Sequence, residues 1–424
     1  MTEPRPWFGQ PRGLTILFLT NMWEQFSYFG MRALLVYYMT KQLMMGQQQS
    51  SFIYGAYTAC AYFTPIVGGV IADRYLGKRR SVIIGASIMA LGHFMMTFEG
   101  LFFPALGAIA LGNGLFLPSL PSQVGDLYKR DDPRRPWAFN VYYVGINVGG
   151  FLAPLVCGTL GEMYGWHYGF GAAGIGMVAG LLIYLWGGRY LPPETPRADP
   201  EQSAAREGFN RQTILLLLSI ALAVTVFRSA YEQVGNTVAL WADSGIDRHA
   251  GTHVIPMTWF QSLNPLFVML MTPPLLAYWQ RRAARDPHQA LVKRMALGAL
   301  LVGVSYLLVA GVSAASGGHQ ASWIWLVLFF AVLTFGELFI LPTGLGLFAH
   351  LAPPHLGATT VAAWFLVIFS GSLSAGFVGT LWSSLSPPEF FILLAVLAGT
   401  SAALLLLISR YGDRAPPRKI DASA

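Results

Sequence analysis

Long apolar stretches, separated by short polar ones, recur along nearly the whole chain. An α-helix needs roughly 20 apolar residues to cross a bilayer, and most of these stretches reach that length. Such unbroken runs do not fit the alternating strands of a membrane β-barrel. The pattern therefore predicts an all-α integral membrane protein with twelve spanning helices, at residues 14–40, 50–73, 81–98, 101–127, 138–161, 168–188, 212–242, 254–280, 295–313, 321–350, 357–384 and 387–409.

Composition agrees, because 54% of the 424 residues are hydrophobic and only 11% are charged, against about 25% charged in ordinary globular domains. The net charge of +7 could indicate nucleic-acid binding, so its distribution matters. Of the 27 Lys and Arg residues, 23 lie in the termini and in the loops that follow even-numbered helices. The loops on the opposite side hold only Lys41 and Arg248. This bias predicts a multi-pass protein with both termini in the cytoplasm.

The only long polar stretch, "PPETPRADPEQSAAREGFNR" at residues 192–211, falls near the midpoint. It divides the chain into an N-terminal six-helix bundle, 1–191, and a C-terminal six-helix bundle, 212–410, followed by a cytoplasmic tail, 411–424. Two six-helix halves joined by a cytoplasmic linker resemble the major facilitator fold. That fold implies a substrate cavity between the halves near the bilayer centre.

The segment "GGVIADRYLGKRR", residues 68–80, resembles the short cytoplasmic loop between helices two and three of that superfamily. Its glycines allow close helix approach, and Asp73 and Arg74 can pair at the helix ends. We therefore expect a conformational role for Asp73 and Arg74. A basic topogenic loop would explain the arginines, but not the glycine and aspartate spacing.

Polar residues also interrupt the predicted spans, where a charge costs at least ~2.5 kcal/mol and is by default a functional hypothesis. In helix one, Asn21, Glu24, Gln25, Tyr28 and Arg32 share a face about 100° wide. That face must look into the protein or a wet cavity. The alternative is a polar seam that joins helices.

Helix seven contains a similar stripe, with Arg228, Glu232 and Asn236 four residues apart. Arg228 and Glu232 can pair locally, so this set is either a neutralised structural pair or a pair that exchanges partners during transport. Helix ten adds Glu337 close to Pro342, and an acid beside a helix break fits a binding site at membrane depth. In helix two, Tyr62 lies deep enough to face a cavity, whereas Tyr54 is expected to pack.

Three kinds of chemistry have no residues to support them. No HExxH motif, nucleotide-binding loop or clustered Cys/His metal pattern is present. We therefore predict no enzymatic activity, no cofactor and no metal site. Transport would be driven by an ion gradient or run downhill.

Several motifs resemble those of the proton-dependent oligopeptide transporter family, whose helix-one signature is usually Glu-x-x-Glu-Arg-Phe-x-Tyr-Tyr-Gly. They occur in the family's order in helices one, two, five, seven, eight and ten: "NMWEQFSYFG", "YFTPIVGGVIADRYLG", "FNVYYVGINVGG", "YEQVGN", "WFQSLNPLF" and "FGELFILPTGLG". The resemblance covers nearly the whole chain. It implies secondary active transport of short peptides or peptide-like compounds, with protons, by alternating access.

The resemblance also implies functional residues. Those matching Asn147, Asn264 and Glu337 would hold the amino end of a peptide, which suits acceptors facing an ammonium. The expected substrate-binding set is Gln25, Tyr28, Arg32, Tyr62, Asn147, Arg228, Asn264, Glu337 and Trp364. The proton-coupling candidates are Glu24, Glu232 and Glu337.

Departures from the family pattern leave two hypotheses open. Asn21 replaces an acid tied to proton coupling, Gln25 and Leu117 replace bases that would serve the peptide carboxylate, and Arg228 replaces a usual tryptophan. Either Arg228 and Arg32 take over the carboxylate, or the substrate is an amine-bearing or peptide-mimetic compound with altered or absent coupling. A peptide-sensing receptor is an alternative of another class. We expect a monomer in a bacterial inner membrane.

Overall fold

The computed structural model describes residues 9–129, 132, 134–193, 211–283, 291–351 and 357–412. Most of the predicted linker, residues 194–210, and most of the predicted tail, residues 413–424, lie outside the described residues.

The described chain is built almost entirely of helices, and each of the twelve predicted spans coincides with one helix or with two consecutive ones. The first half contains α1 (Arg12–Tyr37), α2 (Gln47–Ile71), α3 (Lys78–Met95), α4 (Phe102–Asp126), α5 (Arg135–Ala153), α6 (Thr159–Tyr164) and α7 (Trp166–Gly187). The second half contains α8 (Arg211–Tyr231), α9 (Thr237–Ser244), α10 (Leu263–Ala283), α11 (Leu291–Ala315), α12 (Ile324–Leu351), α13 (Gly357–Thr380) and α14 (Pro387–Gly412). Within these residues, nine helical segments are long and apolar enough to cross a membrane.

Two predicted spans are interrupted rather than continuous. A π-helical segment, Pro154–Gly158, separates α5 from α6, and a 3-10 segment, Glu232–Gly235, separates α8 from α9. The span predicted at 254–280 was wrong at its start, because Met257–Ser262 is a 3-10 segment and α10 begins at Leu263. The helix break expected beside Glu337 is absent, because α12 continues through Pro342 as a single helix.

Four short strands lie at one end of the molecule and were not predicted. β1 (Ile246–Asp247) pairs in parallel with β4 (Ala321–Ser322). β2 (His249–Ala250) pairs antiparallel with β3 (His253–Val254). At two residues each, they join loops and do not form a layer of the fold.

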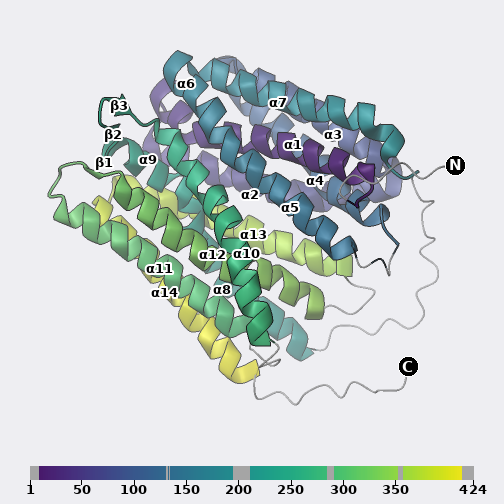
Figure 1. Cartoon of the computed structure of the whole chain (residues 1–424). Helices are drawn as coiled ribbons and strands as arrows, with labels where there is room; N and C mark the ends of the chain where they lie inside the picture. The colour runs from purple at the N-terminus through teal and green to yellow at the C-terminus, as the bar shows by residue number, and fades with distance from the viewer. Residues whose placement is uncertain are drawn as a thin grey trace.

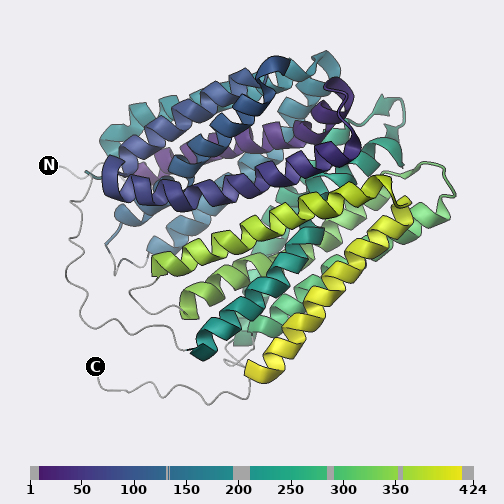
Figure 2. The same ribbon diagram turned by 180° about the vertical axis from the view of Figure 1, so that it is seen from behind.

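The helices form two bundles that lie side by side (Figure 1), with α1–α7 in one and α8–α14 in the other. The reverse view shows α2 and α13 running together at the boundary (Figure 2). The bundles meet closely at the end that carries the strands, and they diverge toward the end where α1 begins and α14 ends. This arrangement is the major facilitator fold predicted from the sequence.

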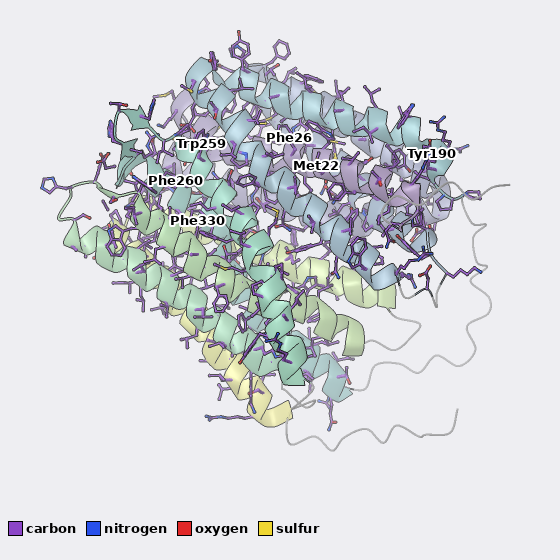
Figure 3. All side chains as sticks on the ribbon, in the orientation of Figure 1. Met22, Phe26, Tyr190, Trp259, Phe260 and Phe330 are labelled. Atoms are coloured by element: carbon purple, nitrogen blue, oxygen red, sulfur yellow. The ribbon has the colours of Figure 1, made fainter. Side chains whose placement is uncertain are left out.

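Hydrogen bonds between the bundles close the strand end. The Tyr37 hydroxyl donates to the Ala239 carbonyl at 2.7 Å. The carboxylate of Glu162 in α6 accepts from the backbone N–H groups of Met257 and Thr258, each at 2.9 Å. Figure 3 shows Trp259 at this end, where its indole N–H donates to the Thr159 hydroxyl at 2.8 Å.

Candidate functional site

A cavity of about 180 Å³ lies between the two bundles. Its walls come from α1, α2 and α5 on one side and from α8, α10 and α12 on the other. Seven residues singled out from the sequence line it: Arg32, Tyr62, Asn147, Arg228, Glu232, Asn264 and Glu337. The structure thus brings together polar residues from six helices that are far apart in the sequence.

Glu232 is the centre of the buried charge in this cavity. Its two carboxylate oxygens form separate ion pairs, one with Arg32 from α1 and one with Arg228, one turn earlier in α8. The local Arg228–Glu232 pair predicted from the four-residue spacing is confirmed. The pair with Arg32 crosses between the bundles, so this acid links the two halves directly.

The backbone at Glu232 departs from the α-helix because the chain switches there to a 3-10 segment. Gly235 ends that segment beside the Tyr54 hydroxyl, and a Cβ at this position would overlap the oxygen. The "GN" pair at Gly235 and Asn236 was the available signal for this break. Shortened helices of this kind place charged side chains at membrane depth in many transporters.

Arg32 has a second partner in α2. Its Nε donates to the Tyr54 hydroxyl at 2.7 Å, and its guanidinium lies 5.6 Å from the centre of the Tyr54 ring. The expectation that Tyr54 only packs was therefore wrong. Tyr54 orients the arginine that reaches across to the opposite bundle.

Arg228 lies between two aromatic rings, with its guanidinium 5.5 Å from the centres of both Tyr62 and Tyr231. Its Nη2 also lies 3.3 Å from the Ser372 hydroxyl. Its buried Nε has no hydrogen-bond partner among the described residues. Arg228 lines the cavity, and the planar fork of a guanidinium suits an oxygen ligand.

Acceptor groups line another part of the cavity. Glu337 accepts from the Asn264 amide at 2.6 Å, and the same amide nitrogen lies 3.0 Å from the Thr334 hydroxyl. On the facing bundle, Asn147 donates to the Tyr143 carbonyl at 3.0 Å, which leaves its amide oxygen as an acceptor. These oxygens can bind an ammonium group.

Four of the expected site residues do not line this cavity. Glu24 is buried and accepts from the Gln25 amide at 2.7 Å. The Tyr28 hydroxyl is buried without a partner among the described residues. Trp364 packs against Phe348, with ring centres 5.1 Å apart.

The polar face of helix one explains part of this difference, because it serves two purposes. Asn21 at its beginning donates to the Tyr142 carbonyl of α5 at 3.1 Å, inside the first bundle. Arg32 near its end reaches the cavity and the second bundle. The face is therefore a polar seam between helices along one part and a cavity wall along another.

The predicted loop residues lie far from the cavity. Asp73 and Arg74 fall in a π-helical segment, Ala72–Leu76, and both are exposed. They form no ion pair with each other in the described part of the chain. Nearby, Lys78 forms an ion pair with Asp126 at 2.6 Å.

Several cavity residues were missed by the sequence-based selection: Phe29, Tyr143, Tyr231 and Gln261. All four lie within or directly beside the motifs that carried the family resemblance. Their position in these motifs could have identified them as candidates. The motifs alone do not show which of their residues face the cavity.

A cavity of buried charges between two six-helix bundles, closed at one end and with the bundles diverging at the other, defines a secondary transporter.

Comparison with known proteins identifies the family. The family model described as "POT family" matches residues 79–210 and 203–390. A di-/tripeptide transporter of Lactococcus lactis subsp. cremoris is 31% identical, covering 96% of each chain. A peptide transporter of Yersinia enterocolitica is 31% identical, covering 88% of each. A POT family transporter solved with 5-aminolevulinic acid superposes with a TM-score of 0.88 at 26% identity, covering 96% of this chain and 98% of that one. The chain belongs to the POT family.

Proposed function

We propose that this protein moves short peptides or peptide-like compounds across a membrane together with protons, by alternating access. The observation that carries the proposal is the pairing of opposite chemistries in one cavity. Carboxylate and amide oxygens of Glu337 and Asn147 face the same space as the guanidinium of Arg228. A zwitterion with separated ends satisfies both. The similar Lactococcus protein is named a di-/tripeptide transporter and the Yersinia protein a peptide transporter.

In this arrangement the amino end of the substrate binds at Glu337, Asn147 and Asn264. The carboxylate binds the guanidinium of Arg228, which lines the cavity. This assignment is the first of the two hypotheses from the sequence, in which arginines replace the lost carboxylate clamp. We favour this hypothesis because Arg228 lines the cavity. Gln25, which stands where the family has a base for the carboxylate, does not line it.

The test compares uptake of dialanine with uptake of its C-terminal amide into proteoliposomes. We expect the wild type to prefer the free acid, and Arg228→Gln to raise KM for the acid at least tenfold while leaving the amide unchanged. Arg228→Lys should fall between, because a lysine keeps the charge but not the planar fork. Equal transport of acid and amide by the wild type would contradict the assignment and favour amine-bearing substrates without a carboxylate.

For coupling, we propose that protonation of Glu232 releases Arg32 and Arg228 and so loosens the contact between the halves. The support is the double ion pair, since removing the negative charge removes the attraction that holds both arginines. Glu232→Gln should abolish uptake driven by an inward proton gradient but retain counterflow of labelled dialanine. Glu24→Gln and Glu337→Gln, assayed in parallel, test the other two coupling candidates.

Counterflow also separates transport from sensing, because a receptor cannot exchange solute across a sealed membrane. If wild-type protein binds dialanine but gives no counterflow, the transport proposal is wrong. If only Glu24→Gln loses the proton-driven component, coupling resides in helix one and not at Glu232.

We further propose that both termini face the cytoplasm of a bacterial cell and that the protein acts as a monomer. The distribution of Lys and Arg supports the orientation. With this orientation, the strand end faces outward, and the end at which the bundles diverge faces the cytoplasm. Labelling of a cysteine introduced at Gln48 with an impermeant thiol reagent in intact cells tests the orientation, and the absence of labelling would contradict it.

A further inference from the structure

A second and larger hollow lies outside the transport site, on the face formed by α10, α11 and α12. Its volume is about 890 Å³, and its walls are mostly apolar. Its apolar wall includes Leu270, Met271, Leu297, Phe335 and Phe339. Lipid-facing helices are ordinarily apolar, but an indentation of this size is comparable to sites that hold whole ligands.

One end of this groove is basic and aromatic. Lys293 and Arg294 stand in the first turn of α11, and Tyr278 and Trp279 stand in the last turns of α10. These helix ends lie at the same edge of the predicted membrane span. Tyrosine and tryptophan prefer the level of lipid headgroups, and basic pockets between membrane helices bind anionic headgroups.

The basic end is held in place by its aromatic neighbours. The Arg294 guanidinium lies 5.3 Å from the centre of the Trp279 ring. Trp279 in turn packs edge-on against Phe339 of α12, with ring centres 5.2 Å apart. Lys293 is exposed beside them. The Arg294 guanidinium is thus positioned beside the apolar wall.

The spacing along α10 fits an acyl chain below a headgroup. Leu270 precedes Tyr278 by two turns and therefore lies about 12 Å deeper in the membrane. Between them, Pro273 and Pro274 remove two backbone donors from the helix. A helix that lacks those hydrogen bonds can bend, although α10 continues through both prolines as one helix.

We infer that this groove binds one anionic phospholipid from the leaflet on the side of the basic loops. Its phosphate contacts Lys293 and Arg294, and its acyl chains lie along Leu270, Leu297 and Phe335. Charge complementarity at one end and continuity with the bilayer along the wall identify a lipid rather than a soluble ligand. The inference does not depend on which substrate is transported.

The groove shares two helices with the transport cavity. Val268 of α10 lines the cavity, and Met271, one turn further on, lines the groove. In α12, Glu337 faces the cavity while Phe335 and Phe339 face the groove. A bound lipid would therefore contact the far sides of the helices that carry Asn264 and Glu337.

Native mass spectrometry of the full chain, released from nanodiscs containing equal phosphatidylglycerol and phosphatidylcholine, tests this site. We expect the wild type to retain one phosphatidylglycerol at least tenfold more often than phosphatidylcholine. The double variant Lys293→Gln/Arg294→Gln should lose that preference. The matched control Arg211→Gln/Arg410→Gln removes two exposed basic residues elsewhere in the same bundle and should keep it.

A second variant disrupts the groove in a different way, so that a folding defect in the first variant cannot decide the result. Leu297→Trp fills the groove while both cations remain, and it should also release the lipid, with an unchanged gel-filtration profile. An equal retention of both lipids by the wild type would overturn the inference, as would an unchanged preference in either groove variant. Retention of detergent or free fatty acid in place of a phospholipid would overturn it too.

Discussion

Among the described residues, Glu232 has two guanidinium partners, one on each carboxylate oxygen. Its removal therefore leaves the buried Arg228 and the part-buried Arg32 without a carboxylate. Breaking a buried pair by removing one partner costs about 3–5 kcal/mol. Removing Arg228 instead leaves the Arg32–Glu232 pair intact. Substitutions of Glu232 and of Arg228 should therefore lower the stability of the protein by different amounts.

We expect Glu232→Gln to lower the melting temperature of the purified protein more than Arg228→Gln does. The double variant Arg228→Gln/Glu232→Gln should be more stable than Glu232→Gln alone, because it removes one of the two unpaired cations. Fluorescence-monitored unfolding in one detergent measures all three. Equal losses in the two single variants would show that the charges do not form a coupled unit.

The break between α8 and α9 acts at the scale of the element, because it positions Glu232 and depends on a close contact. The Tyr54 hydroxyl occupies the space that a Cβ at Gly235 would need. The same hydroxyl binds Arg32. A side chain at Gly235 should therefore disturb the link between the bundles without changing any charge.

We expect Gly235→Ala to reduce proton-driven uptake about tenfold. Tyr54→Phe in the same background should recover part of the loss, since it removes the oxygen that meets the new methyl group. Gly311→Ala is the matched control, because nothing lies within 4 Å of a Cβ there. If uptake by the double variant is lower than uptake by Gly235→Ala alone, the steric explanation is wrong.

At the scale of the whole molecule, closure of the strand end depends on contacts that exist only when the bundles meet there. Glu162 of the first bundle accepts three hydrogen bonds from the second bundle. Two come from the backbone N–H groups of Met257 and Thr258, and the third comes from the Thr258 hydroxyl at 2.6 Å. Hydrogen bonds to a charged group contribute about 1.5–3 kcal/mol. These bonds must break when the cavity opens at this end.

We expect Glu162→Ala to shift the protein toward opening at the strand end by a factor of roughly ten or more, since 1.4 kcal/mol corresponds to tenfold. Spin labels at Gln48 and Ser383, whose side chains meet at 3.2 Å, would report a longer separation. Glu99→Gln is the control, because its partner Gln42 lies in the same bundle. An unchanged distance distribution would exclude a latch at Glu162.

The sequence by itself determined the all-helical membrane fold, the two halves, the presence of buried charges and the Arg228–Glu232 pair. These features follow from local rules, namely apolar length, linker polarity and four-residue spacing. Seven of the expected site residues line the cavity. Polar and charged side chains in a membrane span must face the protein interior or a wet cavity.

Only the tertiary structure decided which polar residues meet across the bundles. The pairing of Arg32 with Glu232, the role of Tyr54 and the separation of Glu24 from the cavity depend on helix rotation and on which bundle faces which. Packing of the two bundles sets those quantities over long sequence separations. A pattern along one helix identifies its polar face, but it does not identify the partner that the face will meet.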